Sequence, residues 1–505
     1  MKRLAVVLAA GALLLSGCGG NTQSASEVSE QSVVSEEAEE REYSFFPMPD
    51  DTFVGDTMPF YDGGKMNIFY LADQRDGHLG YHPWALMQTE DYCDYQDQGV
   101  VLNYGETAED QDISLGTGCV IKDKDGLYHA FFTGHNDYRD PKEAIMHATS
   151  TDMINWTKLP EDTFVANENY SLQDFRDPYV FWVDEEQCYW MLVVTRYEKN
   201  GVIAKYTSKD LSKWKDGGVI FTDDMGYGAN LECPTLIKYN DLWYLSFSDQ
   251  WPYKLVHYRV SKSINGPFEA LDKDTIDGNG FYAGRMETDG ENLYVVGWNP
   301  TKVGHDDANE YDWGGSLVTH QVVQQPDGTL LPIVNEKIVE KVTAEMPMEI
   351  VAITDTITDT VSDEENSFKL QGDKYEFVQF DRLPGSYRIE ADVTDFSAGE
   401  KFGIAYNPTD EYVGNMNFVF NVDENTIEFY NTSKLMISDP QSSVDFDYSN
   451  KDSIHLTLIG SSSVVSLYVN DEIALTARMY SAQGSFLELF GINSDVKWEN
   501  VKLYN

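Results

Sequence analysis

One motif plan recurs five times between residues 55 and 298, and it constrains the fold of this chain more than any other feature. Each copy starts a strand-like segment, passes through a turn rich in Asp, Asn or Gly, and ends in an apolar, β-branched and aromatic run. The copies begin at Gly55, Leu115, Phe175, Leu231 and Phe281. A hairpin that returns roughly every 50 to 60 residues has the period of propeller blades. The repeat therefore predicts an all-β fold with a five-bladed β-propeller.

A polar bend before an aromatic residue strengthens this repeat in three of the copies. It runs from Thr89 to Tyr95, from Ser150 to Trp156 and from Ser208 to Trp214, with Asp two residues after the Ser in the last two. Ser, Thr and Asp side chains hydrogen-bond to nearby backbone and so favour turns. We interpret these bends as the outer halves of blades.

Acidic residues stand at or near the same place in three copies, as Asp56, Asp177 and Glu232. The first strand of each blade lines the central axis, so these side chains are expected to meet there. Crowded carboxylates raise one another's pKa, and such groups rarely gather unless they are paired or used. Taken singly, Asp56 as a turn cap, an Arg176–Asp177 ion pair and Glu232 as a satisfied buried acid are structural alternatives. Together the three acids predict a catalytic site.

The pattern changes after the fifth copy. From about residue 349 onward, alternating apolar and polar segments are separated by turns, as in 387–393, 418–422 and 464–471. This alternation is typical of an antiparallel β-sandwich. We therefore place the catalytic propeller at residues 44–345 and a β-sandwich domain at residues 346–505.

The N-terminus resembles a bacterial lipoprotein signal. A basic start, Met1-Lys2-Arg3, precedes a short apolar stretch and the sequence Leu15-Ser16-Gly17-Cys18. The resemblance implies that residues 1–18 are a signal, that Cys18 is lipidated, and that the protein is extracytoplasmic, held at the bacterial cell surface by this membrane anchor alone. The alternative is an ordinary secretory signal with a chance cysteine. Residues 19–43, rich in Ser, Glu and Gln, are expected to form a disordered acidic tether.

Net charge and cysteine spacing limit the classes of partner and cofactor that the chain is expected to bind. The chain has 36 Lys and Arg against 85 Asp and Glu, a formal net charge of -49, which argues against nucleic acid as a partner. A neutral ligand such as a sugar fits better. The four cysteines beyond Cys18 form no C-x-x-C or Cys/His cluster, so we expect buried free thiols, no metal and no cofactor. We expect a monomer.

Two motifs together, Phe175-Arg176-Asp177-Pro178 and Leu231-Glu232-Cys233-Pro234, resemble those of glycoside hydrolase family 32, the family of invertases, levanases and inulinases. The resemblance runs from about Pro47 to the C-terminus. It implies a retaining, double-displacement hydrolysis of β-fructosidic bonds in fructans or sucrose-like oligosaccharides. Carried over to this sequence, Asp56 is the nucleophile, Glu232 the acid/base, and Asp177, beside Arg176, stabilises the transition state.

Further residues are candidates for holding the sugar. Their positions follow the first hairpin or lie on inner strands: Asp73, Arg75, His82, Trp84, Thr117 and Tyr282. For Trp84, a place in the blade core is an equal alternative, and for Thr117 a role in close strand packing is one. The chain also departs from the family, which has Asn-Asp-Pro-Asn-Gly around the nucleophile, whereas this sequence has Gly55-Asp56-Thr57-Met58-Pro59.

Two other functions compete with this interpretation. An inverting arabinosidase or xylosidase also uses two aspartates and a glutamate on five blades. A surface glycan-binding lipoprotein on an inactive hydrolase scaffold belongs to a different class. A binder has little need of three converging acids, so their presence favours an enzyme.

Overall fold

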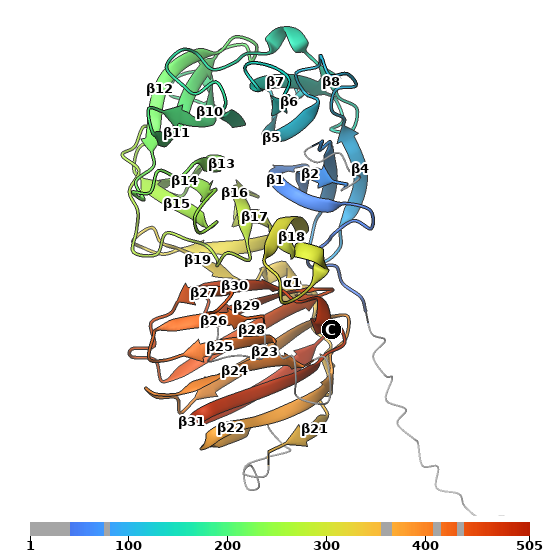
Figure 1. Ribbon diagram of the computed structural model, residues 1–505, viewed down its shortest axis with the longest axis vertical. Helices are drawn as coiled ribbons and strands as arrows, with labels where there is room; N and C mark the ends of the chain where they lie inside the picture. Colours follow the sequence, from blue (N-terminus) through green and yellow to red (C-terminus); the bar gives the residue numbers. More distant parts are fainter. Residues whose placement is uncertain (1–40, 75–80, 355–365, 408–415, 432–438) are drawn as a thin grey trace, which may run out of the picture. The chain divides into compact units, whose positions relative to one another are not determined.

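Antiparallel sheets arranged as five blades make up the first part of the chain in this computed structural model, which describes residues 41–74, 81–354, 366–407, 416–431 and 439–505 (Figure 1). The predicted signal, Cys18, most of the tether and Arg75 lie outside the described residues. The first blade comprises β1 (Phe53–Asp62), β2 (Lys65–Asp73), β3 (Trp84–Thr89) and β4 (Gln96–Leu102). The second comprises β5 (Ser114–Lys122), β6 (Tyr128–His135), β7 (Glu143–Ser150) and β8 (Thr157–Lys158).

The remaining blades follow in chain order. The third comprises β9 (Phe175–Val183), β10 (Cys188–Tyr197), β11 (Asn200–Ser208) and β12 (Lys215–Thr222). The fourth has β13 (Leu231–Tyr239), β14 (Leu242–Asp249) and β15 (Val256–Ser261). The fifth has β16 (Tyr282–Thr288), β17 (Leu293–Lys302), β18 (Tyr311–Gln324) and β19 (Leu330–Ile333). The inner strands β1, β5, β9, β13 and β16 contact one another in turn around the ring, which confirms the predicted five-bladed propeller.

The first and last blades are joined by backbone pairing. Val54 of β1 pairs with Gly315 of β18, so blades five and one form a single hydrogen-bonded sheet. This pairing closes the ring between segments more than 250 residues apart in sequence.

The polar bends form as the sequence predicts. Ser150 Oγ accepts a hydrogen bond from the backbone N–H of Met153 at 3.0 Å, and Ser208 Oγ accepts one from Leu211 at 3.0 Å. Both Met153 and Leu211 have positive φ, 65° and 63°. The side-chain cap satisfies the backbone of this tight turn, which explains why the same bend recurs from blade to blade.

The C-terminal domain is a sandwich-like antiparallel sheet, as predicted (Figure 1). A short helix α1 (Glu336–Lys341) precedes it. Its strands are β20 (Glu345–Met346), β21 (Ile350–Ile353), β22 (Phe368–Arg382), β23 (Ser386–Thr394), β24 (Lys401–Asn407), β25 (Met416–Asn421), β26 (Thr426–Tyr430), β27 (Ser442–Asp445), β28 (Ser453–Ser461), β29 (Val464–Val469), β30 (Ile473–Arg478) and β31 (Phe486–Tyr504). The long strand β31 pairs with β22, β23 and β24 and so ties the sheet together.

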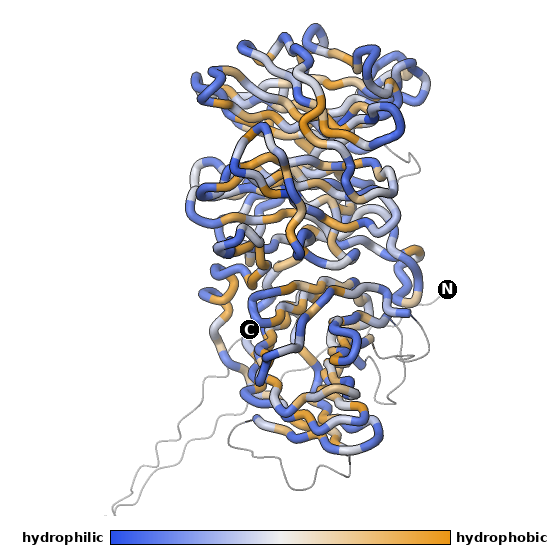
Figure 2. Tube along the Cα trace, turned by 90° about the vertical axis from the view of Figure 1, so that its left-hand side faces the viewer, coloured by the Kyte–Doolittle hydropathy of each residue, from blue (hydrophilic) through white to orange (hydrophobic). Residues whose placement is uncertain are grey.

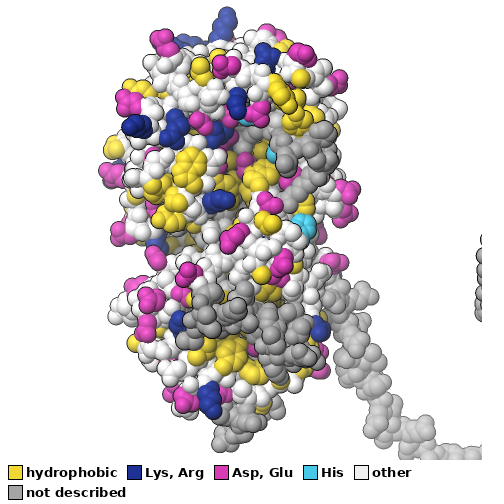
Figure 3. Space-filling model, viewed as in Figure 1, with side chains coloured by type: hydrophobic (Ala, Val, Ile, Leu, Met, Phe, Trp, Pro, Cys, Tyr) yellow, Lys and Arg dark blue, Asp and Glu magenta, His cyan; other side chains and the backbone are white. Residues whose placement is uncertain are grey.

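Apolar residues follow the strands and hydrophilic residues follow the turns between them (Figure 2). Two large buried clusters result, one in the propeller that reaches Val464 and Tyr468, and one inside the sandwich around Trp498. Acidic side chains are spread over the visible face rather than gathered in one patch (Figure 3). Among the described residues, no helix is long and apolar enough to cross a bilayer.

Candidate active site

All five inner strands carry a break in strand register at the same end. The breaks lie between Gly55 and Thr57, Leu115 and Gly118, Arg176 and Tyr179, Glu232 and Thr235, and Tyr282 and Arg285. A β-bulge inserts an extra residue, bends its strand and re-aims side chains, which is why bulges occur beside active sites. Asp177, Cys233 and Ala283 lie inside three of these bulges with φ of 56°, 53° and 52°.

The registers place Asp177 and Glu232 one residue apart on their strands. This agrees with the sequence, in which the acids stand at or near the same place of the repeat. Glu232, Arg176 and Tyr282 each stand directly before a bulge, whereas Asp56 and Asp177 lie within one.

Asp56 is held from two sides. Its Oδ2 accepts a hydrogen bond from Thr117 Oγ1 at 3.0 Å, and its Oδ1 accepts one from Trp298 Nε1 at 3.2 Å. Burial, together with the nearby charge of Asp177, raises the pKa of Asp56 to about 6 against these hydrogen bonds. The carboxylate is thus fixed in orientation by neutral donors and has no direct cation partner among the ion pairs of the described residues.

Glu232 has a different environment. Arg176 Nη2 lies 3.2 Å from its Oε1, and the Tyr282 hydroxyl donates to its Oε2 at 2.6 Å. Burial raises the pKa of Glu232 to about 7, because it outweighs the opposing charge of Arg176, and the carboxyls of Asp177 and Asp56 add to the rise. A protonated Glu232 near neutral pH is what donation to a leaving oxygen requires.

Asp177 is buried, with 4% of its surface exposed, and lies close enough to both other acids to raise their pKa values. Its Oδ2 accepts a hydrogen bond from the backbone N–H of Cys233 at 2.9 Å, and its own N–H donates to Thr133 Oγ1 at 2.9 Å. The structure thus brings together the three acids that the sequence singled out.

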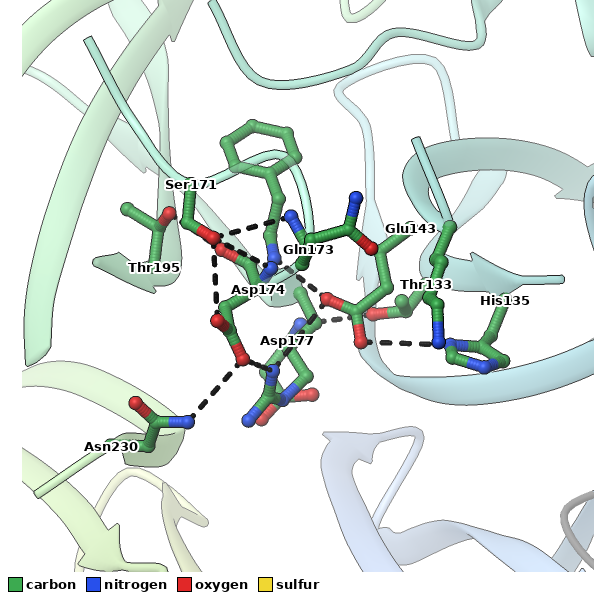
Figure 4. Close-up of polar contacts among 12 residues, drawn as sticks. Thr133, His135, Glu143, Ser171, Gln173, Asp174, Asp177, Thr195 and Asn230 are labelled. Carbon is green, nitrogen blue, oxygen red and sulfur yellow. Dashed lines mark hydrogen bonds and ion pairs between the residues drawn. The ribbon is translucent and has the colours of Figure 1, made fainter. Parts of the chain in front are cut away.

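Arg176 is held by further carboxylates around it. Asp174 Oδ1 lies 3.1 Å from Nη1, and Glu143 Oε2 lies 3.6 Å from the same nitrogen. Asp174 also accepts from Asn230, and Glu143 accepts from the backbone N–H of Phe175, so both acids are themselves fixed (Figure 4). This network aims the guanidinium at Glu232 and could not be read from the sequence.

A cavity of about 590 Å³ opens beside these groups. Its lining residues are Asp56, Glu232, Gln250, Pro252, Tyr253, Lys254, Asn279, Tyr282, Trp298, Pro300, Glu310, Tyr311, Asp312 and Trp313. Sequence reasoning missed Trp298 as a site residue.

Trp313 lies against Gly55, where an added Cβ would stand 2.1 Å from a ring carbon. Glycine before Asp56 is therefore required by the indole, a signal that only the packing reveals.

The predicted sugar-holding residues divide into groups. Tyr282 lines the cavity, Thr117 contacts Asp56, and His82 stacks on Trp313 with ring centroids 4.5 Å apart. Asp73 is buried close to Gly314, and Arg75 lies outside the described residues.

The prediction that Trp84 holds the sugar is wrong. Trp84 is 0% exposed, packs against Phe69 and Phe132, and donates Nε1–H to Gly116 O at 3.0 Å. Trp84 therefore belongs to the buried apolar cluster between the first and second blades and does not line the cavity. The four cysteines of the described residues are buried free thiols, as expected: Cys93, Cys119, Cys188 and Cys233.

The family profile "Glycosyl hydrolases family 32 N-terminal domain" matches residues 48–347. Among curated proteins, the sucrose-6-phosphate hydrolase of Staphylococcus xylosus is 26% identical over 33% of this chain and 33% of its own length. The raffinose invertase of Escherichia coli is 24% identical over 54% of this chain and 59% of its own. Each match thus spans less than two thirds of the relative.

Solved structures share the fold over almost the whole chain. A GH32 β-fructofuranosidase of Bombyx mori in complex with sucrose has a TM-score of 0.68 at 17% identity, covering 92% of this chain and 93% of that one. The exo-inulinase of Aspergillus awamori has a TM-score of 0.69 at 16% identity, covering 92% and 98%.

Proposed function

The chain belongs to glycosyl hydrolase family 32, and from this premise we propose that it hydrolyses β-fructosidic bonds by a retaining, double-displacement mechanism. The observation that carries the proposal is that Asp56 and Glu232 line one cavity and are held by different partners. Thr117 and Trp298, both neutral donors, hold Asp56, whereas Arg176 and Tyr282 hold Glu232. Glycoside hydrolysis requires two such carboxyl groups, one ionised and one protonated, and burial raises the pKa of both.

In the first step, the Asp56 carboxylate attacks the anomeric carbon of the fructosyl unit while protonated Glu232 gives its proton to the leaving oxygen. The glycosidic bond breaks, the leaving sugar departs as an alcohol, and a fructosyl ester of Asp56 remains. In the second step, the Glu232 carboxylate takes a proton from water, whose oxygen attacks the anomeric carbon and frees Asp56. Asp177 stabilises the oxocarbenium-like transition state through the substrate hydroxyls.

The name of each relative supports the substrate class. Proteins named sucrose-6-phosphate hydrolase, raffinose invertase and levanase all match part of this chain. Gly55, Thr57 and Met58 replace residues of the family motif around the nucleophile, so a panel of substrates distinguishes fructans from sucrose-like oligosaccharides. We also propose that Cys18 is lipidated and holds the enzyme at the extracytoplasmic face of the cell membrane.

Incubation with sucrose, inulin, levan and arabinan tests the function. We expect fructose-containing products from at least one of the first three and none from arabinan. Glu232→Gln is the matched control, because it keeps the volume and removes the acid. Cleavage of arabinan alone would favour the arabinosidase, and binding without cleavage of any sugar would favour a glycan-binding protein. NMR of the first-formed sugar reports whether the anomeric configuration is retained.

A further inference from the structure

Two exposed tyrosines form a surface beside the cavity that the chemistry above does not use. Tyr253 lines the cavity and is 61% exposed, while Tyr227, which does not line it, is 37% exposed. Their ring centroids are 5.8 Å apart at an interplanar angle of 80°. The pair, called here the tyrosine shelf, therefore extends aromatic surface outward from the cavity. Apolar rings with a polar tip are well suited to sites that are partly wet.

A buried carboxylate fixes both tyrosines. Asp249 Oδ2 accepts hydrogen bonds from the Tyr227 hydroxyl at 3.3 Å and from the backbone N–H of Tyr253 at 3.2 Å. Its Oδ1 accepts one from the Leu255 N–H at 2.5 Å, and the Asp249 side chain is itself 0% exposed. The shelf is thus held in place by a built anchor rather than by chance contact between two loops.

The shelf is tied to the proposed acid rather than to the nucleophile. Asp249 pairs with Leu231, and the next pair on the same strands joins Ser248 to Glu232. The nucleophile Asp56 is held from another direction, by Trp298 of blade five and Thr117 of blade two. Glu232 must face the departing oxygen, and Tyr253 lines the same cavity from the blade that carries Glu232.

We propose that the tyrosine shelf binds sugar units on the leaving-group side, so that the enzyme prefers fructan oligosaccharides of three or more units over a disaccharide. This inference rests on the proposed function. The cavity, at about 590 Å³, is within the range of about 300 to 1,000 Å³ for ligand pockets and exceeds one monosaccharide. A longer chain that leaves it beside Tyr253 reaches Tyr227 next.

Steady-state kinetics of Tyr253→Ala and Tyr227→Ala on sucrose and on fructo-oligosaccharides of increasing length test the proposal. We expect each variant to raise KM for the oligosaccharides by about 2- to 10-fold, the size of aromatic stacking effects. Tyr227→Ala, outside the cavity, should leave sucrose little changed, and Tyr253→Ala should affect the oligosaccharides more than sucrose. Tyr253→Trp, which keeps an aromatic ring, should restore the low KM. Trp182→Ala is the matched control, because Trp182 is 43% exposed at the other end of β9 and should leave all substrates unchanged.

The outcomes separate this proposal from the function it rests on. If the wild type cleaves no fructoside, the proposed function fails. If it cleaves fructosides but Tyr253→Ala alters sucrose and oligosaccharides equally, or Tyr253→Trp does not restore the KM, the shelf proposal alone is overturned. Titration of oligosaccharides into Glu232→Gln, which does not turn them over, measures their binding affinity. The same titration into the double variant Glu232→Gln, Tyr253→Ala shows how much of that affinity depends on Tyr253.

Discussion

Arg176 and Glu232 occupy the same position, directly before the bulge, on the adjacent strands β9 and β13, and their side chains meet at 3.2 Å between Nη2 and Oε1. Tyr282 holds that position on β16 and contacts Glu232 from the other side at 2.6 Å. Three equivalent positions of the repeat thus form one row, with the proposed acid at its centre.

The two carboxyls are expected to respond differently to the leaving group. Asp56→Asn and Glu232→Gln should each lower kcat on a natural fructoside by about 10²- to 10⁴-fold. An aryl fructoside with a good leaving group needs no proton from Glu232, so Glu232→Gln should recover much of its activity there while Asp56→Asn should not. Steady-state kinetics on both substrates measure this, and equal losses for both variants would contradict the assigned roles.

The pH profile of kcat/KM should be bell-shaped. Asp56 must be ionised, which requires a pH above about 6, and Glu232 must be protonated, which requires a pH below about 7. The Tyr282 hydroxyl lowers the pKa of Glu232 through its hydrogen bond, so Tyr282→Phe should move the alkaline limb of kcat/KM to higher pH. A shift of that limb to lower pH, or a shift of the acid limb alone, would contradict this arrangement.

Removing the Asp56 charge should stabilise the fold above pH 6. Burial raises the pKa of Asp56 from 3.8 to about 6, so the folded state binds the proton more tightly and the free energy of unfolding falls as pH rises between these values. Asn carries no such charge. The Tm of Asp56→Asn minus that of the wild type should therefore become more positive as the pH rises from 4 to 7.

Asp62→Asn is the matched control, and its stability relative to the wild type is expected to change with pH in the opposite direction. Burial raises the pKa of Asp62, but hydrogen bonds from Lys122 and Tyr128 outweigh it and lower the value. Asp62→Asn should therefore lose stability relative to the wild type as pH rises through the acid range. Thermal melts of both variants across pH check the pair, and parallel trends would show that Asp56 is not destabilised by burial.

The sandwich is expected to support the cavity wall. Arg478 of β30 donates Nε–H to Pro300 O at 3.0 Å and Nη2–H to Asn299 O at 2.8 Å, and Pro300 lines the cavity. Arg478→Met leaves these carbonyls without their donor, at a cost of about 2 kcal/mol or more. We expect a lower Tm and a higher KM, while Arg382→Met, an exposed change on the same domain, should leave both unchanged.

Membrane attachment has its own test. If Cys18 is lipidated, the protein should fractionate with membranes, and protease cleavage between residues 21 and 42 should release active enzyme. Cys18→Ala should give soluble protein with the same kcat. Equal recovery of lipid-modified, membrane-bound protein from Cys18→Ala would exclude this attachment site and leave the hydrolase assignment intact.

The sequence by itself determined the five blades, the sandwich and the identity of the three acids, because each blade is a local hairpin with its own turn chemistry and each acid lies near a repeated motif. Only the tertiary structure decided the bulges that hold Asp56 and Asp177, the core position of Trp84, the contact of Trp298 with Asp56, and the anchoring of Tyr253 by Asp249. Bulges shift side chains without changing the apolar pattern, and contacts between blades join residues as far apart as Asp56 and Trp298, so neither is recorded in local sequence.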